Sequence, residues 1–267
     1  MSDYIYKITS SEAGVVAGSI VNLHTHEIRL FDSSNPLYDL IREYINSDDL
    51  ENAFRCSDMS EYIKTESTFI SENISYDSIG NLFFKESLLP SGITDTILKA
   101  IKSGNRSAIS ALAQFVERVV KSATNASKEA LFSWIRDRSL SVSEDGCFIA
   151  YKGVTPSLKS ITAGPGYVNG EEVHGHLDNS IGNVVSVDRD YVEQEVGEAC
   201  GPGLHAGTYS FAESFSKNFS KDGVVVAVKI KPENVVSVPW DSNYQKLRVC
   251  EYEVIGVVED ESQDVLF

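Results

Sequence analysis

Alternation of apolar and polar residues is the first pattern along the chain. When β-branched and aromatic side chains occupy every second position, the pattern is typical of strands that bury one face. Three segments carry it: YIYKI (4–8), GVVAGSIVNL (14–23) and HEIRLF (26–31). They predict a small sheet or hairpin at this end of the chain.

The apolar residues then change to helical spacing. The segment PLYDLIREYINS begins at Pro36, which suits a first turn, and predicts a helix over about residues 36–55. One face of this helix would carry Leu37, Leu40, Ile41 and Tyr44. A short strand is predicted within residues 79–90. Three helical segments follow between residues 94 and 139: TDTILKAIKSG, RSAISALAQFVERVVKSA and SKEALFSWIRDRS.

Caps and apolar stripes support these helices. Thr94 and Ser127 are candidate N-caps, and Gly104 is a stop signal. Two apolar stripes follow the second and third helices: Phe115, Val116, Val119 and Val120, then Leu131, Trp134 and Ile135. Such stripes are typical of helix faces that pack into a core. We therefore expect packing rather than chemistry from this part of the chain.

Runs of β-branched residues, separated by Gly, Pro, Asn and Asp, make up the remainder. The predicted strands lie in GCFIAYKGV, GNVVSVD, VVVAVKIK, VVSVP and RVCEYEVIGVV. Between two of them, the polar, Gly-rich segment 161–176 predicts a mobile surface loop. The expected fold class is α+β. A helix-rich N-terminal domain with a small β segment would span residues 1–140, and a β-rich C-terminal domain residues 141–267.

Composition narrows the classes of function. The chain has 39 acidic and 23 basic residues and a net charge of −16, which repels the phosphates of nucleic acids and anionic lipids. No segment approaches the roughly 20 apolar residues that span a bilayer, and the amino terminus lacks a signal-peptide pattern. The four scattered cysteines are typical of reduced thiols. We expect a cytoplasmic protein that binds no nucleic acid and has no membrane span.

Two His-x-His pairs, His24/His26 and His174/His176, are weak candidates for a metal site. Residues two apart on a strand share a face, so each pair would present two imidazoles to one ion. Only ordinary acidic residues lie near either pair in the sequence. We therefore expect solvated histidines and no metal.

The predicted strand RVCEYEVIG carries two carboxylates on one face. Under two-residue alternation Glu251 and Glu253 lie beside each other, with Val249 and Ile255 on the same face. A pair of carboxylates in a cleft can hold ribose hydroxyls, or stabilise the cation that forms as a glycosidic bond breaks. The alternative is a strand whose glutamates simply face solvent.

The segment GPGLHAGTYSFAESF (201–215) joins a Gly-rich loop to a short amphipathic helix. Its glycines permit tight backbone geometry, and Phe211, Phe215 and Phe219 would lie along one side of the helix and pack under the loop. Backbone amides near the start of the helix would face an anionic ligand. His205 either reaches into a cleft or only hydrogen-bonds the loop.

Ordered motifs give the chain a family resemblance. The segments are SVSEDGCFIAYKGV, HLDNSIGNVVSVDRDYVEQE, CGPGLHAGTYSFAESF and VVVAVKIKPENVVSVPWDSNYQKLRVCEYEVIG. In this order they resemble the carboxy-terminal half of the rIIB-type proteins of tailed bacteriophages. The helical stretch before them is similar more loosely. The resemblance implies an early phage protein in the host cytoplasm, often beside a larger rIIA-type partner. It also implies a link to lysis timing and to protection from prophage-encoded exclusion.

The same half is also similar, more faintly, to the ADP-ribosyltransferase fold. There a YRG or YHG strand, a GxGIYFA-like segment and a late strand bearing a glutamate clasp NAD. The resemblance implies cofactor contacts from Tyr151, Lys152, Gly153, Gly203, His205, Thr208 and Ser210. Glu251 or Glu253 would take the place of the catalytic glutamate. Lys152 departs from the Arg or His of that fold, and lysine contacts phosphate as a point charge without the fork of arginine. The resemblance thus implies weak or absent catalysis.

Two hypotheses follow, and they belong to different classes. The first is a non-enzymatic, cofactor-free phage protein that modulates lysis or counters a host or prophage defence. It would act by binding a protein, either an rIIA-type phage protein or a host defence component. The second is an ADP-ribosyltransferase-like protein that binds NAD or a related nucleotide.

Overall fold

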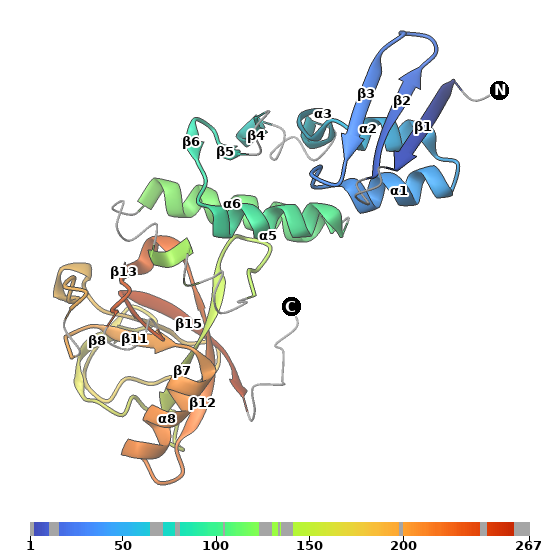
Figure 1. Ribbon diagram of the computed structural model, residues 1–267. Coiled ribbons are helices and arrows are strands. Elements are labelled where there is room, and N and C mark those ends of the chain that lie inside the picture. Colours follow the sequence, from blue (N-terminus) through green and yellow to red (C-terminus); the bar gives the residue numbers. More distant parts are fainter. Residues whose placement is uncertain are drawn as a thin grey trace. The chain divides into compact units, whose positions relative to one another are not determined.

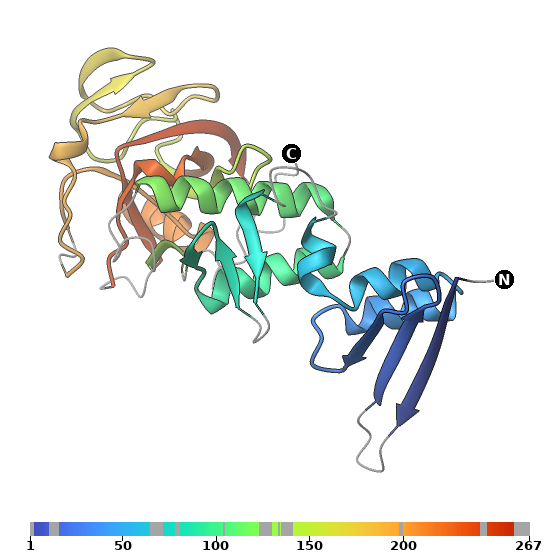
Figure 2. The same ribbon diagram turned by 90° about the horizontal axis from the view of Figure 1, so that it is seen from above.

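The structure is a computed structural model of the chain (Figures 1 and 2). It divides into two compact units, Met1–Ala113 and Gln114–Phe267, which are treated separately below. The residues it describes are 3–10, 16–64, 72–77, 81–103, 105–122, 130–132, 134, 141–197, 200–240 and 245–258. The predicted domain boundary near residue 140 lies in the second unit and outside these residues, so it stays a prediction.

The first unit begins with an antiparallel three-stranded sheet in the order β1-β2-β3. The strands are β1 (Tyr4–Ser10), β2 (Val16–Asn22) and β3 (Ile28–Asp32), as the two-residue alternation predicts. Ile20 and Phe31 are buried on one face of the sheet, and α2 packs against β1 and β2 (Figure 2). Burying one apolar face of each strand is what holds this sheet on its helices.

Helices α1 (Tyr38–Asn46), α2 (Leu50–Cys56) and α3 (Met59–Lys64) follow the sheet. The predicted helix over residues 36–55 is thus two helices, because Asp48 adopts a positive φ of 61° and Asp49 caps α2 by accepting from the backbone amide of Asn52. Arg29 of β3 is buried with its guanidinium 4.1 Å from the ring centroid of Phe54. Its charge is paired with the carboxylates of Glu27 and Glu61.

A second small sheet and two longer helices complete this part of the chain. The sheet contains β4 (Ile74–Tyr76), β5 (Leu82–Phe84) and β6 (Ser87–Leu88), and the helices are α5 (Ser91–Lys102) and α6 (Arg106–Ser122). The single strand predicted within residues 79–90 is therefore a hairpin. The boundary between the two units falls within α6.

The predicted N-cap at Thr94 is wrong. Helix α5 begins earlier, after Pro90, whose φ of −58° suits the entry to a helix, and Thr94 is buried inside the first turns. The side chain of Thr94 bonds back to the carbonyl of Leu89 at 3.5 Å instead of capping the helix. The other predicted signals of these helices, Gly104, Ser127 and Ile135, lie outside the described residues.

The second unit is dominated by a nine-stranded antiparallel sheet in the order β13-β14-β11-β7-β12-β15-β10-β8-β9. Its strands are β7 (Phe148–Val154), β8 (Gly164–Val168), β9 (Glu171–Gly175), β10 (Val184–Ser186), β11 (Leu204–Gly207), β12 (Val224–Ile230), β13 (Val235–Ser237), β14 (Lys246–Val249) and β15 (Glu251–Val258). Short 3₁₀ turns lie at Arg189–Tyr191 and Pro232–Asn234, and helix α8 is Tyr209–Phe219. The predicted fold class, α+β with a β-rich C-terminal part, is confirmed.

Two sequence predictions in this unit are wrong. The segment 161–176 is a hairpin of β8 and β9 rather than a mobile loop, because Asn169 and Gly170 adopt positive φ angles of 53° and 83° that suit a tight two-residue turn. The run RVCEYEVIGVV is two strands, since the ladder breaks at Cys250. Strand β14 pairs with β11 and β13, whereas β15 pairs with β12 and β10.

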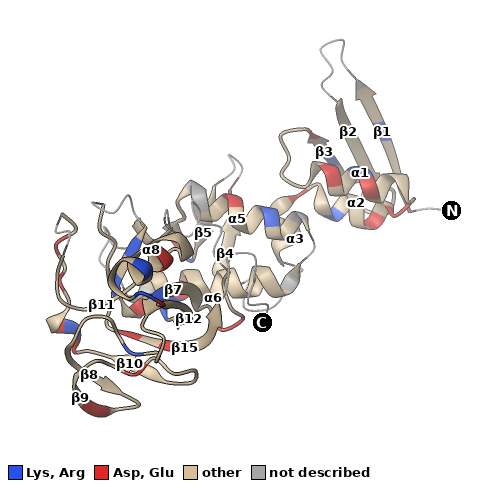
Figure 3. Cartoon of the chain, turned by 90° about the horizontal axis from the view of Figure 1, so that it is seen from below, with Lys and Arg blue, Asp and Glu red and all other residues tan. Residues whose placement is uncertain are grey.

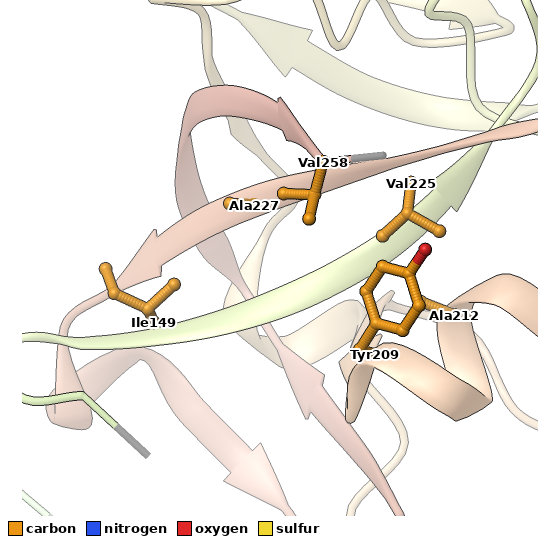
Figure 4. Close-up of a cluster of buried hydrophobic side chains, with 6 residues drawn as sticks. All are labelled: Ile149, Tyr209, Ala212, Val225, Ala227 and Val258. Carbon is orange, nitrogen blue, oxygen red and sulfur yellow. The ribbon is translucent and has the colours of Figure 1, made fainter. Parts of the chain in front are cut away.

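Helix α8 packs on one face of the central strands (Figure 1). The buried residues of this contact are Ile149, Tyr209, Ala212, Val225, Ala227 and Val258, and Figure 4 shows Tyr209 and Ala212 of the helix directed at the strand residues. A Cβ atom on Gly153 would lie 2.4 Å from the carbonyl oxygen of Ala212. The close approach of α8 to β7 therefore requires glycine at this position.

An aromatic cluster forms another part of the core of the second unit. The ring of Phe148 lies 6.3 Å from that of Phe115 and 5.8 Å from that of Trp134, both edge to face. Val116, Val119 and Leu131 are also buried, whereas Val120 is half-buried. The predicted assignment of the two apolar stripes to the core is confirmed for the described residues.

Candidate functional site

A cavity of about 180 Å³ lies where β7, β11 and α8 meet. Strand β7 contributes Tyr151, Lys152 and Gly153, and α8 contributes Phe211, Ala212 and Phe215. The loop before β11, residues 201–203, and the segment 160–165 close the remaining sides. The sheet thus supplies one wall, the helix a second, and two Gly-rich loops the others.

The cavity has a buried floor and an exposed rim. Leu177, Val187 and Leu204 on the floor are buried. Thr162 and Pro202 are exposed at the opposite side. A mostly apolar hollow with few polar groups is the usual character of a small-molecule site.

Lys152 is a cation inside this hollow. Its ammonium donates a hydrogen bond to the carbonyl of His205 at 3.0 Å and lies 5.5 Å from the ring centroid of Tyr252. Burial lowers the pKa of Lys152 to about 8. Among the described residues no carboxylate offsets that cost, so in this part of the chain the side chain is a poorly compensated positive charge.

His205 places a second polar group at the cavity. Its ring is hydrogen-bonded to the backbone of Gly201, whereas Nε2 is buried with no hydrogen-bond partner among the described residues. Burial lowers the pKa of His205 to about 3, and the charges of Lys152, Lys246 and Arg248 lower it further. The imidazole is therefore neutral at pH 7, with one ring nitrogen left unbonded.

The position of His205 follows from the pairing of β11 with β14. In that register His205 lies opposite Arg248, and Gly207 lies opposite Lys246. A Cβ atom on Gly207 would come within 2.3 Å of the carbonyl oxygen of Gln245, so glycine is needed for the two strands to approach. The Gly-rich sequence around His205 thus serves strand pairing as well as the cavity.

Helix α8 begins immediately after β11 and supplies an aromatic wall. Thr208 caps the helix, because its Oγ1 accepts a hydrogen bond from the backbone amide of Phe211 at 3.2 Å. The rings of Phe211 and Phe215 are stacked with their centroids 6.3 Å apart. The prediction that the phenylalanines lie under the Gly-rich loop is confirmed for Phe211 and Phe215, which line the cavity, and is wrong for Phe219, which is 67% exposed and does not line it.

Most of the cofactor residues suggested by the resemblance converge here. Those that line the cavity are Tyr151, Lys152, Gly153, Gly203 and His205. Thr208 and Ser210 lie at the start of α8 instead, where their hydroxyls are 3.2 Å apart. The sequence predicted the segment 161–176 only as a Gly-rich surface loop of the kind that often carries function; residues 160–165 line the cavity, and Gly164 and Pro165 begin β8.

The two glutamates lie on another part of the sheet. Glu251 is 3.4 Å from the ammonium of Lys231 and accepts a hydrogen bond from Asn234 at 3.1 Å. Glu253 is exposed on the same face of β15. Neither is among the residues that line the cavity, so the structure does not bring them to Lys152 and His205.

The histidine pairs make ordinary contacts. His24 lies 2.9 Å from Asp3, His174 lies 3.2 Å from Glu172, and His176 contacts the carbonyl of Ser160 at 2.7 Å. Within the described ranges, no group of three His, Cys, Asp or Glu side chains is placed to hold a metal ion. In the same part of the chain, no helix is both long enough and apolar enough to cross a membrane.

The charges around the cavity contrast with those of the chain as a whole. Figure 3 shows acidic positions on β9 and on α1 and α2, whereas β7 carries a lysine and α8 carries Lys217 paired with Glu213. No aspartate or glutamate is among the described residues that line the cavity. Fold and site together define an α+β protein with a small cavity that contains a half-buried cation.

Comparison with known proteins identifies the family. A family model described as "Bacteriophage T4 protein rIIB" matches residues 16–265, so the chain belongs to the rIIB family of phage proteins. It is similar to Protein rIIB of Enterobacteria phage T4, with 30% identity over 183 residues, or 68% of this chain and 53% of that protein. The chain thus spans about half the length of this curated relative. No solved structure matches the chain.

Replacing Lys152 by methionine is expected to stabilise the second unit. Because the pKa of Lys152 falls from 10.5 to about 8 on folding, burial of the charged form costs free energy at pH 7. Methionine has a similar length and no charge, so the free energy of unfolding should rise by about 2 kcal/mol after the lost hydrogen bond is subtracted.

The pH dependence of unfolding tests the sign of this predicted change in stability. The cost in the wild type is fully present below pH 8 and disappears as the pH rises to 10.5, where both states are neutral. Urea unfolding of both proteins should therefore give a difference that shrinks over this range. A methionine variant less stable than the wild type at pH 7 would contradict the prediction.

Proposed function

We propose that this rIIB-family protein acts early in infection, in the host cytoplasm, by binding a protein partner. Through that partner it modulates lysis or counters a host or prophage defence. Membership of the rIIB family supports a role in the phage cycle. The candidate partners are an rIIA-type phage protein and a component of a host defence system.

An apolar sheet face in the first unit is the observation that carries this proposal. Ile5, Val21 and Ile28 are paired side by side across β1, β2 and β3, and Leu30 follows in the next row. Ile5 is 52% exposed, Ile28 62% and Leu30 76%. On the opposite face Ile20, Arg29 and Phe31 are buried, whereas Tyr6 near the edge of the sheet is 48% exposed.

Adjacent exposed apolar side chains on a sheet are typical of a protein-binding surface. Release of ordered water from such a surface favours binding. Each large aliphatic side chain that becomes fully buried contributes about 1.5–3 kcal/mol to the free energy of binding. The neighbouring strand positions carry Lys7, Ser19 and Asp32, which place polar groups around the apolar row. An apolar centre with a polar border is the ordinary anatomy of a protein interface.

The test uses phage that encode the double variant Ile28→Ser, Leu30→Ser. We expect this phage to lose the partner that the wild-type protein retains on purification. It should also show the lysis timing and the growth on prophage-bearing hosts of a phage that lacks the gene. Leu88→Ser is the matched control, because Leu88 is 59% exposed in the same unit but lies on β6.

Two results would count against the proposal in different ways. If the double variant, shown by circular dichroism to be folded, retains the partner and the full phage phenotype, the sheet face is not the interface. If deletion of the gene changes neither lysis timing nor growth on any prophage-bearing host, the proposed role itself fails.

NAD binding is a second candidate, supported by the convergence of Tyr151, Lys152 and His205 on one cavity. The position of Glu251 and Glu253 outside that cavity favours binding without transfer chemistry. A thermal-shift titration with NAD and ADP-ribose tests this, because a ligand at 100 times its Kd stabilises the native state by about 2.7 kcal/mol. Because both glutamates lie outside the cavity, Glu251→Gln and Glu253→Gln should leave the thermal shift unchanged. The absence of a thermal shift with either ligand rejects this candidate.

A further inference from the structure

The volume of the cavity limits the size of a ligand. It encloses about 180 Å³, and a protein cavity of about 150 Å³ is enough to bind benzene. One flat ring with one small substituent therefore matches the space. A complete dinucleotide is much larger, so only one part of it would fit inside this hollow and the rest would extend past the exposed rim.

The charge of the cavity indicates which substituent the ring of the ligand carries. Lys152 is the one Lys, Arg, Asp or Glu among the described lining residues, and its printed hydrogen bond to the carbonyl of His205 engages one of three N–H donors. Within the part of the chain that the structure describes, no carboxylate lines the cavity beside the remaining donors, although the net charge of the whole chain is −16. A carboxylate or phosphate would supply the missing counter-charge, and hydrogen bonds between charged groups are the stronger kind.

His205 adds a second polar contact at the same wall. Its Nε2 is buried with no hydrogen-bond partner among the described residues, and pairing it with a ligand would offset the free energy that an unsatisfied buried polar atom costs. Lys246 and Arg248 on β14 add positive potential at His205. An anion bound here would be favoured by all of these cations, and it would draw a proton onto the imidazole.

The remaining walls suit a flat apolar group. Phe211 and Phe215 present stacked rings from α8, and Leu177 and Val187 form part of the buried floor. Aromatic side chains bind planar rings by offset stacking or edge-to-face contact. The cavity thus combines apolar walls with the polar side chains of Lys152 and His205 and with hydroxyl groups from Tyr151, Ser160, Thr162 and Tyr191.

We propose that the cavity between β7, β11 and α8 binds a small single-ring anion, a planar molecule with one carboxylate or phosphate group that Lys152 and His205 hold. This site lies within the second unit and does not depend on the protein-binding face of the first unit. It is a binding site for a small metabolite-sized molecule, and it requires no reaction.

Calorimetric titration of the full chain tests the site with benzoate, benzamide, phenyl phosphate and inorganic phosphate. Benzoate and benzamide have nearly the same shape, but only benzoate is charged. We expect a benzoate or phenyl phosphate Kd of roughly 0.1–1 mM, which is reasonable for ligands of this size. Benzamide should bind at least about tenfold more weakly, since it lacks the charge that pairs with the ammonium. If phenyl phosphate binds more tightly than benzoate, the charged group that the site prefers is a phosphate. If benzoate binds more tightly, the preferred group is a carboxylate.

Two lysine variants test whether benzoate binds in the cavity. Lys152→Met should weaken benzoate binding at least about tenfold while the protein remains folded, because the substitution removes charge without removing bulk. Lys217→Met is the matched control, since Lys217 lies on α8 in an exposed pair with Glu213 and does not line the cavity. It should bind benzoate as the wild type does.

Proton uptake gives an independent measure. At pH 8.5 a benzoate ion beside Lys152 should bind together with a proton, so the heat of binding should depend on the ionisation enthalpy of the buffer. Equal affinity for benzoate and benzamide, or an unchanged affinity in Lys152→Met, would overturn the proposal. So would the absence of saturable binding by any of the anions at about 10 mM, which includes the case in which NAD alone binds.

Discussion

Phe148→Ala is expected to lower the free energy of unfolding of the second unit by about 4 kcal/mol, within the usual range for a buried phenylalanine. Phe148 has no exposed surface, and its ring contacts those of Phe115 and Trp134 at centroid distances of 6.3 and 5.8 Å. Both neighbours are themselves buried, so they cannot relax toward solvent to fill the space. The loss therefore combines lost apolar burial with the cost of a cavity.

Tryptophan fluorescence during urea unfolding is the appropriate measurement. Both tryptophans of the chain, Trp134 and Trp240, lie in the second unit, so their signal follows that unit separately. Phe219→Ala is the control, because Phe219 on α8 is 67% exposed and its loss should cost less than about 1 kcal/mol. A cost below about 1.5 kcal/mol for Phe148→Ala would show that this cluster is not the core of the unit.

The second large effect is a loss of stability of the second unit in mild acid, caused by His205. The pKa of this imidazole is 6.5 in the unfolded chain and about 3 in the native state. Between those values the unfolded state binds the additional proton, so the free energy of unfolding falls as the pH falls. The expected loss is up to about 1.4 kcal/mol per pH unit, or about 2 kcal/mol between pH 7.5 and pH 5.2.

The physical reason is burial, reinforced by the neighbouring cations Lys152, Lys246 and Arg248. Above pH 5 most carboxylates stay ionised, so this range isolates the histidines from the acidic residues. Urea unfolding of His205→Gln should lose most of the pH dependence of the wild type. His174→Gln, altered at an exposed histidine of β9, should keep it. A wild-type stability that is constant from pH 7.5 to 5.2 would show that His205 titrates normally.

Lys152 and His205 therefore work against the stability of the fold. Lys152 is a half-buried charge without a counter-ion among the described residues, and His205 is an imidazole that folding keeps neutral. Substitutions that stabilise a protein at the expense of binding are common at functional sites. The combination expected for Lys152→Met, a gain in stability and a loss of anion binding, would separate a binding residue from a structural one.

Local sequence patterns predicted most of the secondary structure. The alternation in the first segments corresponds to β1, β2 and β3, and the apolar stripe around Phe115 corresponds to a buried face of α6. The errors in the predicted secondary structure occur where one local sequence signal lies close to another that overrides it. Thr94 resembles a cap, but Pro90 starts the helix earlier, and the Gly-rich segment 161–176 resembles a loop although Asn169-Gly170 folds it into a hairpin.

The site was predictable in part. The order of the YKG strand, the GPGLHAG loop and the helix predicted a common location for Tyr151, Lys152 and His205, and all three line the cavity. The glutamates were placed on one strand face by the two-residue period, and they do share that face. Whether that face lines the same cavity depends on how β15 is ordered in the sheet, which alternation within one strand does not encode.

The sequence by itself determined the α+β class, the rIIB-family motifs, the acidic character and the faces of most strands, because these depend on residues close together in the chain. Only the tertiary structure decided that Lys152 is half-buried and that the outer face of β1–β3 is exposed. It alone also shows that, among the described residues, no carboxylate pairs with Lys152 and no group bonds Nε2 of His205. The physical reason is that desolvation and pairing depend on the whole environment of an atom. That environment comes from strands and helices that are far apart in the sequence.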